Sequence, residues 1–89
     1  MIGKIFYTER FIKRLKKLPP EIIDLACEKE SLFKENPLHP SLRLHGLKGK
    51  MRGYWSISVN ERCRIIFRRL DSGDILFISI GNHDIYRHF

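Results

Sequence analysis

The sequence predicts a single α+β domain in which two N-terminal helices pack on an antiparallel sheet, with the element order β-α-α-β-β-β. Two observations favour this fold class: apolar residues recur at helical spacing early in the chain, and from Gly53 onward the period changes to two. The chain has 89 residues, which is enough for one hydrophobic core and too few for two. Residues 1–89 are therefore expected to form one domain.

The N-terminal part is expected to form a short strand followed by two helices. Residues 3–8 have the composition of a strand, and the hydroxyl of Thr8 can cap the helix that follows. The apolar side of that helix consists of Phe11, Leu15 and Leu18. A Pro-Pro pair ends it, and Pro20 suits the first turn of a second helix that runs to about Glu35. Neither helix is apolar enough to be stable alone, so both need a sheet to cover.

The second half of the chain alternates between apolar and polar residues, as half-buried strands do. In the first two expected strands, the apolar residues lie on the face that packs against the helices. They are Trp55, Ile57, Val59, Cys63, Ile65 and Phe67. A turn at 71–74 leads to a last strand over 75–80. If the strands keep their phase, the opposite face carries Tyr54, Ser56, Ser58, Arg64, Ile66 and Arg68. The stretch 38–52 has no lasting periodicity and is expected to be a loop.

The composition points to a polyanionic partner. Lys and Arg number 17 against 10 Asp and Glu, which leaves a net charge of +7 and favours nucleic acid or an acidic protein, with solubility alone as the other interpretation. No apolar run approaches the ~18 to 20 residues that span a bilayer, and the N-terminus lacks the features of a secretion signal, so we expect a cytoplasmic protein. Cys27 and Cys63 are too few and too far apart for a disulfide framework or a zinc site, and reduced thiols are expected.

Titratable and cationic side chains near the sheet are the candidates for chemistry. His45 precedes the sheet and His83 follows its last strand, and imidazole titrates near neutrality, so the two could supply a base and an acid for phosphodiester transfer. Taken alone, each of these histidines fits a surface or packing role better than a catalytic one, and it is their placement that favours chemistry. Arg64 and Arg68 project from one expected strand face, where guanidinium groups can bind phosphate.

Three separated segments carry a resemblance to a known family. They are residues 44–59, which include Leu-Lys-Gly and Gly-Tyr-Trp-Ser, residues 63–67, Cys-Arg-Ile-Ile-Phe, and residues 80–87, Ile-Gly-Asn-His-Asp-Ile-Tyr-Arg. In order and spacing they resemble the RelE/ParE toxin superfamily, and most nearly its RelE, YoeB and YafQ branches. The similarity covers essentially the whole chain, including the Lys-rich first helix.

The resemblance implies a RelE-like fold and the toxin of a type II toxin-antitoxin system. In the RelE branch it implies a ribosome-dependent endonuclease for messenger RNA, an mRNA interferase, in which the substrate 2′-hydroxyl attacks the adjacent phosphate without a metal or cofactor. The implied partners are the ribosome, mRNA and a cognate antitoxin whose acidic amphipathic helix covers the basic sheet face. Two alternatives share the fold: a ParE-like DNA gyrase inhibitor and a catalytically silent basic binding protein.

Carried over residue by residue, the resemblance assigns catalytic roles to four positions. His45 matches a catalytic Glu or His of the YoeB and YafQ branches, Arg64 matches the strand arginine of RelE and YoeB, and His83 matches a late-chain histidine. Tyr86 matches the C-terminal aromatic residue. His45 and His83 are thus expected to transfer protons, in an order left open, while Arg64, with Arg68, holds the scissile phosphate.

RNA binding is assigned to further residues, and some family positions differ. The expected contacts to the RNA backbone are Lys48, Lys50 and Arg52, and the aromatic residues expected to stack on bases are Tyr54, Tyr86 and Phe89, with packing as the other role for Tyr54. Ser56 and Ser58 stand where RelE has catalytic lysines, and Ser58 and Arg62 stand where YafQ has its second His and its Asp. A lysine-based acid-base mechanism is therefore not expected for this chain.

Overall fold

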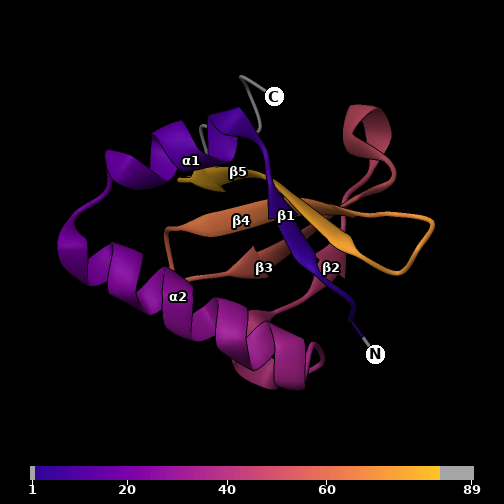
Figure 1. Cartoon of the computed structure of the whole chain (residues 1–89), viewed down its shortest axis with the longest axis horizontal. Helices are drawn as coiled ribbons and strands as arrows, with labels where there is room; N and C mark the ends of the chain where they lie inside the picture. Colours follow the sequence, from indigo (N-terminus) through magenta and orange to yellow (C-terminus); the bar gives the residue numbers. More distant parts are fainter. Residues whose placement is uncertain (1, 83–89) are drawn as a thin grey trace.

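Two helices cover one face of a five-stranded mixed sheet in the computed structural model, which describes residues 2–82 (Figure 1). The elements are β1 (Ile5–Tyr7), α1 (Glu9–Lys16), α2 (Pro20–Glu35), β2 (His45–Gly46), β3 (Tyr54–Ser58), β4 (Arg64–Arg69) and β5 (Ile75–Gly81). Two short 3-10 turns, η1 (Pro40–Leu42) and η2 (Gly49–Met51), lie on either side of β2. Within residues 2–82, no helix has the length and apolar character needed to span a bilayer.

The α+β class and the predicted helices are confirmed, and the sheet differs from the expected one in two respects. Its strand order is β1-β5-β4-β3-β2, and β1 pairs with β5 in parallel, with Ile5 opposite Ile75, so the sheet is mixed and not wholly antiparallel. Short turns make β3, β4 and β5 antiparallel, but β1 and β5 are separated by most of the chain, so no turn dictates their direction. The expected loop over 38–52 contains β2, which is too short to show a period in the sequence.

The predicted inward-facing residues form the core. Ile57, Val59, Cys63, Ile65 and Phe67 are all buried against the helices, and Trp55 packs at the margin of this cluster. Phe33 of α2 lies at the centre, with its ring centroid 4.9 Å from that of Phe67 and 6.1 Å from that of Phe77. Burial of these rings is a large favourable contribution to folding, because aromatic side chains remove a large apolar area from water.

A β-bulge changes the phase of β5. Ile66 lies opposite Ser79 and Phe67 lies opposite Phe77, so Ile78 has no partner residue on β4. The extra residue allows both Phe77 and Ile80 to face the core although they are three positions apart. The same shift turns Ser79 to the other face of the sheet.

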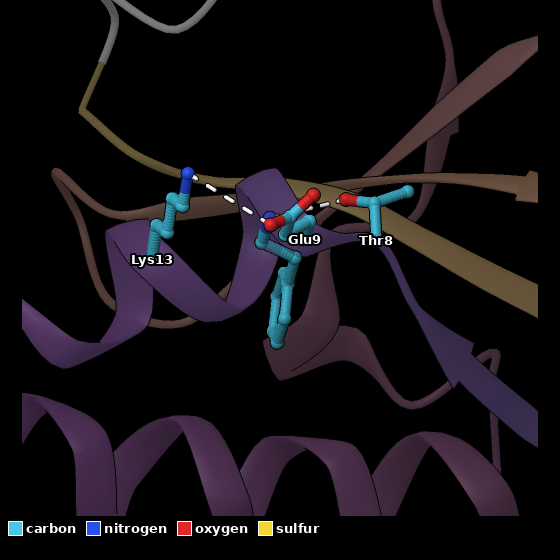
Figure 2. A network of polar contacts seen from close by, with 4 residues as sticks. Thr8, Glu9 and Lys13 are labelled. Atoms are coloured by element: carbon cyan, nitrogen blue, oxygen red, sulfur yellow. Dashed lines mark hydrogen bonds and ion pairs between the residues drawn. The ribbon is translucent and has the colours of Figure 1, made fainter.

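Thr8 joins β1, α1 and the bulge. Its hydroxyl accepts a hydrogen bond from the Phe11 N–H (3.0 Å) and donates one to the carbonyl oxygen of Ile78 (2.7 Å). The Thr8 N–H donates to the Phe77 carbonyl oxygen (3.0 Å). Figure 2 shows Thr8 at the start of α1, next to the ion pair of Glu9 with Lys13. The hydroxyl therefore satisfies one free N–H of the helix and one carbonyl of the bulge.

Tyr7 connects β1 to α2 through a hydrogen bond that its hydroxyl donates to the Glu30 carboxylate. Burial raises the pKa of Tyr7 to about 12, and the hydrogen bond to Glu30 and the charge of Glu30 act in the same direction. The phenol is therefore protonated, and able to donate, at neutral pH.

Thr8→Ala is expected to lower the free energy of unfolding by about 1 to 2 kcal/mol, because it removes both the helix cap and the bond to the bulge carbonyl. Thr8→Ser keeps the hydroxyl and is expected to restore most of the stability. Glu9→Gln is the control, since the Glu9–Lys13 pair is exposed and exposed pairs contribute little. Chemical denaturation measures all three variants, and a Thr8→Ala protein as stable as the wild type would contradict the proposed role.

Candidate nucleic-acid interface

The sheet face away from the helices, here called the outer face, carries four of the expected site residues. The cross-strand pairs on it are His45 with Ser56, Tyr54 with Arg68, and Ser58 with Arg64. Residues two apart on a strand point to the same side, so these pairs share one face. The predicted phase of the two central strands is thus confirmed, and His45, Tyr54, Arg64 and Arg68 lie on the same side of the molecule.

His45 is held in one tautomer by the backbone. Its ring is exposed, and Nδ1 lies 3.0 Å from the carbonyl oxygen of Arg43. A carbonyl can only accept, so Nδ1 carries the proton and donates it. Nε2 of the neutral ring is consequently the nitrogen with a free lone pair, as a general base requires.

Arg64 is anchored at the start of β4. Its Nη1 donates to the carbonyl oxygen of Asn60 (2.7 Å), with a longer contact to that of Cys63 (3.5 Å). The Asn60 side chain in turn accepts from the N–H groups of Arg62 (2.9 Å) and Cys63 (2.7 Å), which braces the turn between β3 and β4. A guanidinium has five N–H donors, so the anchored group retains donors for an anion.

His45 and Arg64 are two strands apart, roughly 10 Å across the sheet. They are also offset by two residues, roughly 7 Å, along the strands, because His45 lies opposite Ser56 and Arg64 lies opposite Ser58. The residues of β3 between them are Ser56 and Ser58. Their side chains are short, so they do not block the space between the His45 and Arg64 side chains. β5 ends beside Arg64, because Gly81 is its cross-strand partner.

A basic loop borders one end of the outer face. Lys48, Lys50 and Arg52 are exposed in the connection between β2 and β3, which includes η2. The Leu47 N–H donates to the Tyr54 carbonyl oxygen (2.9 Å) and closes this loop at the end of β3. The loop projects beyond the sheet next to β2 (Figure 1). The cations of the basic loop therefore lie at the same end of the outer face as Arg68, which is opposite Tyr54. Arg64 lies at the other end of the outer face.

Three of the expected site residues, His83, Tyr86 and Phe89, lie outside the described residues. The other expected catalytic and RNA-binding residues all lie on the outer face or in the basic loop. The described part of the chain therefore places one of the two expected histidines, the strand arginines and the loop cations on one side of the molecule, with Arg64 and Arg68 roughly 13 Å apart along β4.

The structure also reveals features that sequence analysis missed. Ser56, Ile66 and Ser79 are buried although they lie on the outer face, away from the helices. Ser58 is only 5% exposed, and within residues 2–82 its hydroxyl has no hydrogen-bond partner. Arg43 has a left-handed φ of 47°, unusual for a residue other than glycine. No local pattern signals these features, because they depend on cross-strand neighbours and on the fold of the 38–52 segment.

Comparison with known proteins identifies similar structures and no sequence match. No family model and no curated protein sequence matches the chain. Among solved structures, YafQ from E. coli superposes with a TM-score of 0.78 at 20% identity, over 97% of this chain and 98% of that one. A YoeB/ParE toxin from Agrobacterium tumefaciens gives 0.76 at 21% identity, over 91% and 99%.

A chain of the RelBE2 toxin-antitoxin complex from Mycobacterium tuberculosis is similar to the same degree. Its TM-score is 0.76 at 20% identity, over 93% of this chain and 100% of that one. The expected RelE-like fold is thus confirmed over nearly the whole length of the chain.

Proposed function

We propose that this protein is the toxin of a type II toxin-antitoxin pair and that it cleaves messenger RNA on the ribosome. The observation that carries the proposal is the register of β3, which gives His45 and Arg64 a common face. The shared fold of YafQ, YoeB/ParE and RelBE2 toxins and the surplus of cations support it. Because the proposed site of action is the ribosome, the proposal includes a cytoplasmic location for the protein.

In the proposed reaction, Nε2 of His45 takes the proton from a substrate 2′-hydroxyl. The 2′-oxygen attacks the adjacent phosphorus, the bond from phosphorus to the 5′-oxygen breaks, and a general acid protonates the leaving 5′-oxygen. The N–H donors of Arg64 stabilise the charge that develops on the phosphoryl oxygens. The hydrogen bond from Nδ1 to Arg43 favours His45 as the base, which leaves the role of acid to His83, with Tyr86 assisting.

Binding of the RNA is assigned to the groups around this centre. Arg68 and the basic loop neutralise the backbone phosphates without sequence choice, and Tyr54 stacks on a base. The long side chains of the loop suit an extended, irregular surface such as a ribosomal site.

His45→Ala is expected to reduce cleavage of ribosome-bound mRNA by about 10² to 10⁴-fold, the usual loss for a general base. Arg64→Ala is expected to cost about 10² to 10³-fold through lost charge stabilisation. Arg69→Ala is the matched control, because Arg69 is on the same strand but points to the opposite face. Full cleavage by both site variants would reject the assignment.

Mapping of message ends after induction in cells separates the proposal from the other functions. New cuts inside codons support an mRNA interferase. DNA damage with intact messages would indicate a ParE-like gyrase inhibitor, and no change in either nucleic acid would indicate a silent binding protein.

Removal of one cation from the basic loop is expected to weaken the salt dependence of ribosome binding. For Lys48→Ala, Lys50→Ala or Arg52→Ala, the slope of log K against log salt should become shallower by about 0.7 to 0.9 per lost phosphate contact. Lys34→Ala, which removes an exposed charge from α2, is the control and should leave the slope unchanged. Unchanged slopes in all three loop variants would show that the loop does not contact phosphate.

The proposed partner is a cognate antitoxin with an acidic amphipathic helix that covers the outer face. RelBE2 is a toxin-antitoxin complex with a similar toxin fold. Such a helix would neutralise Arg64 and Arg68, so Arg68→Glu is expected to weaken the complex at least tenfold, and added salt to weaken the wild-type complex. Co-purification and calorimetry with the product of the neighbouring gene measure this, and the absence of any complex would count against the proposal.

A further inference from the structure

A pocket of about 320 Å³ lies on the helix-covered side of the sheet, between the C-terminal end of α2 and the turn that joins β4 to β5 (Figure 1). It is here called the α2 pocket. Its walls include the apolar residues Phe33, Leu38, Leu44, Trp55 and Phe67, and the charged residue Arg69. The sheet separates it from the outer face, so it is distinct from the proposed reaction centre.

The apolar wall of the α2 pocket continues into the hydrophobic core. Phe33 and Phe67 are buried, and their ring centroids lie 4.9 Å apart. Leu44 and Trp55 are half-buried beside the core cluster, and Leu38 is 78% exposed. An apolar ligand would therefore cover hydrophobic side chains that the fold itself leaves partly in water, which is favourable.

Arg69 gives the pocket a positive charge. Its side chain is on the same side of β4 as that of Phe67, because the two residues are two positions apart on the strand. Among the lining residues that the structure describes, Arg69 is the one with a charged side chain. Within residues 2–82, no ion pair or side-chain hydrogen bond occupies its guanidinium. A guanidinium binds a carboxylate through two parallel hydrogen bonds, so this group suits a single carboxylate.

The size of the pocket favours a small molecule. Its volume of about 320 Å³ is at the lower end of the range of about 300 to 1,000 Å³ that is common for ligand sites. At about 30 Å³ for each water-sized group, it holds roughly ten non-hydrogen atoms. The N–H and carbonyl of Gly73, which also lines the pocket, are already bonded to Leu70 and Gly3. They are therefore not available to a strongly polar ligand such as a sugar.

We propose that the α2 pocket binds a small apolar monocarboxylate, a medium-chain fatty acid such as octanoate, which has about this number of atoms. Its hydrocarbon chain contacts Leu44, Trp55 and Phe67. Its carboxylate accepts two hydrogen bonds from Arg69. Charge complementarity favours the acid over an alcohol or an amine of the same length, because the lining adds one positive charge to an apolar recess.

The fluorescence of Trp55 provides the direct test, because Trp55 is the single tryptophan of the chain and lines the pocket. Titration of the full chain with octanoate is expected to change the emission and to saturate. Octanol and octylamine are expected to bind at least tenfold more weakly, since neither pairs with the guanidinium. Each methylene removed from the acid should weaken binding about fourfold. Equal binding of octanol and octanoate would overturn the proposal, as would the absence of a saturable change.

Two pairs of variants test the named groups. Arg69→Gln is expected to weaken octanoate binding about tenfold and to leave octanol binding unchanged, because it removes the charge alone. Arg62→Gln, which changes an exposed arginine in the turn between β3 and β4, is the control and should bind octanoate like the wild type.

Leu38→Asp adds a negative charge to the lining and should weaken octanoate binding more than octanol binding. Leu38→Asn is its uncharged counterpart and should affect both ligands alike. Leu38 is exposed, so neither change should disturb folding. Octanoate binding that is unchanged in both Arg69→Gln and Leu38→Asp would overturn the assignment.

Sedimentation and cleavage assays separate this inference from a different occupant and from the proposed function. A monomer at all concentrations is the expected state, and a wild-type dimer that Leu38→Asp dissociates would identify a second copy as the occupant and overturn the proposal. Octanoate binding by a protein that cuts no message supports the pocket and rejects the mRNA interferase. Cleavage on the ribosome without octanoate binding overturns the pocket and leaves the proposed function standing.

Discussion

The register of β3 against β2 and β4 determines which side chains can meet on the outer face. A slip of one residue would exchange the two faces of the strand, so that Ile57 would leave the core and Ser56 and Ser58 would enter it. The aromatic cluster around Phe33 and Phe67 opposes such a slip, because it fills the space between α2 and the sheet. Packing on the helix side thus positions the polar groups of the other side.

The part of the sheet beside α1 depends on a second feature, the bulge at Ile78 of β5. Without the extra residue, β5 could not turn both Phe77 and Ile80 toward the core. Thr8 satisfies the carbonyl oxygen of Ile78 and caps α1 with the same hydroxyl, so the irregularity in β5 and the start of the helix stabilise each other.

Backbone carbonyl groups position the proposed catalytic side chains. The Arg43 carbonyl orients His45, and the Asn60 carbonyl orients Arg64. Both carbonyls belong to irregular segments beside the sheet, the one between η1 and β2 and the other between β3 and β4. This arrangement limits the motion of the imidazole and the guanidinium before substrate binds, which is the geometric condition for efficient proton transfer and charge stabilisation.

The sequence by itself determined the helices and the inward faces of β3 and β4, and it supplied His45 and Arg64 as candidate site residues. The cap at Thr8, the proline at the start of α2 and the alternation after Gly53 are local signals, and the motifs of the resemblance added the site residues. Only the tertiary structure decided the parallel pairing of β1 with β5, the short β2, the bulge and the burial of Ser58. These features depend on contacts between residues far apart in the chain, whereas periodicity and capping depend on near neighbours.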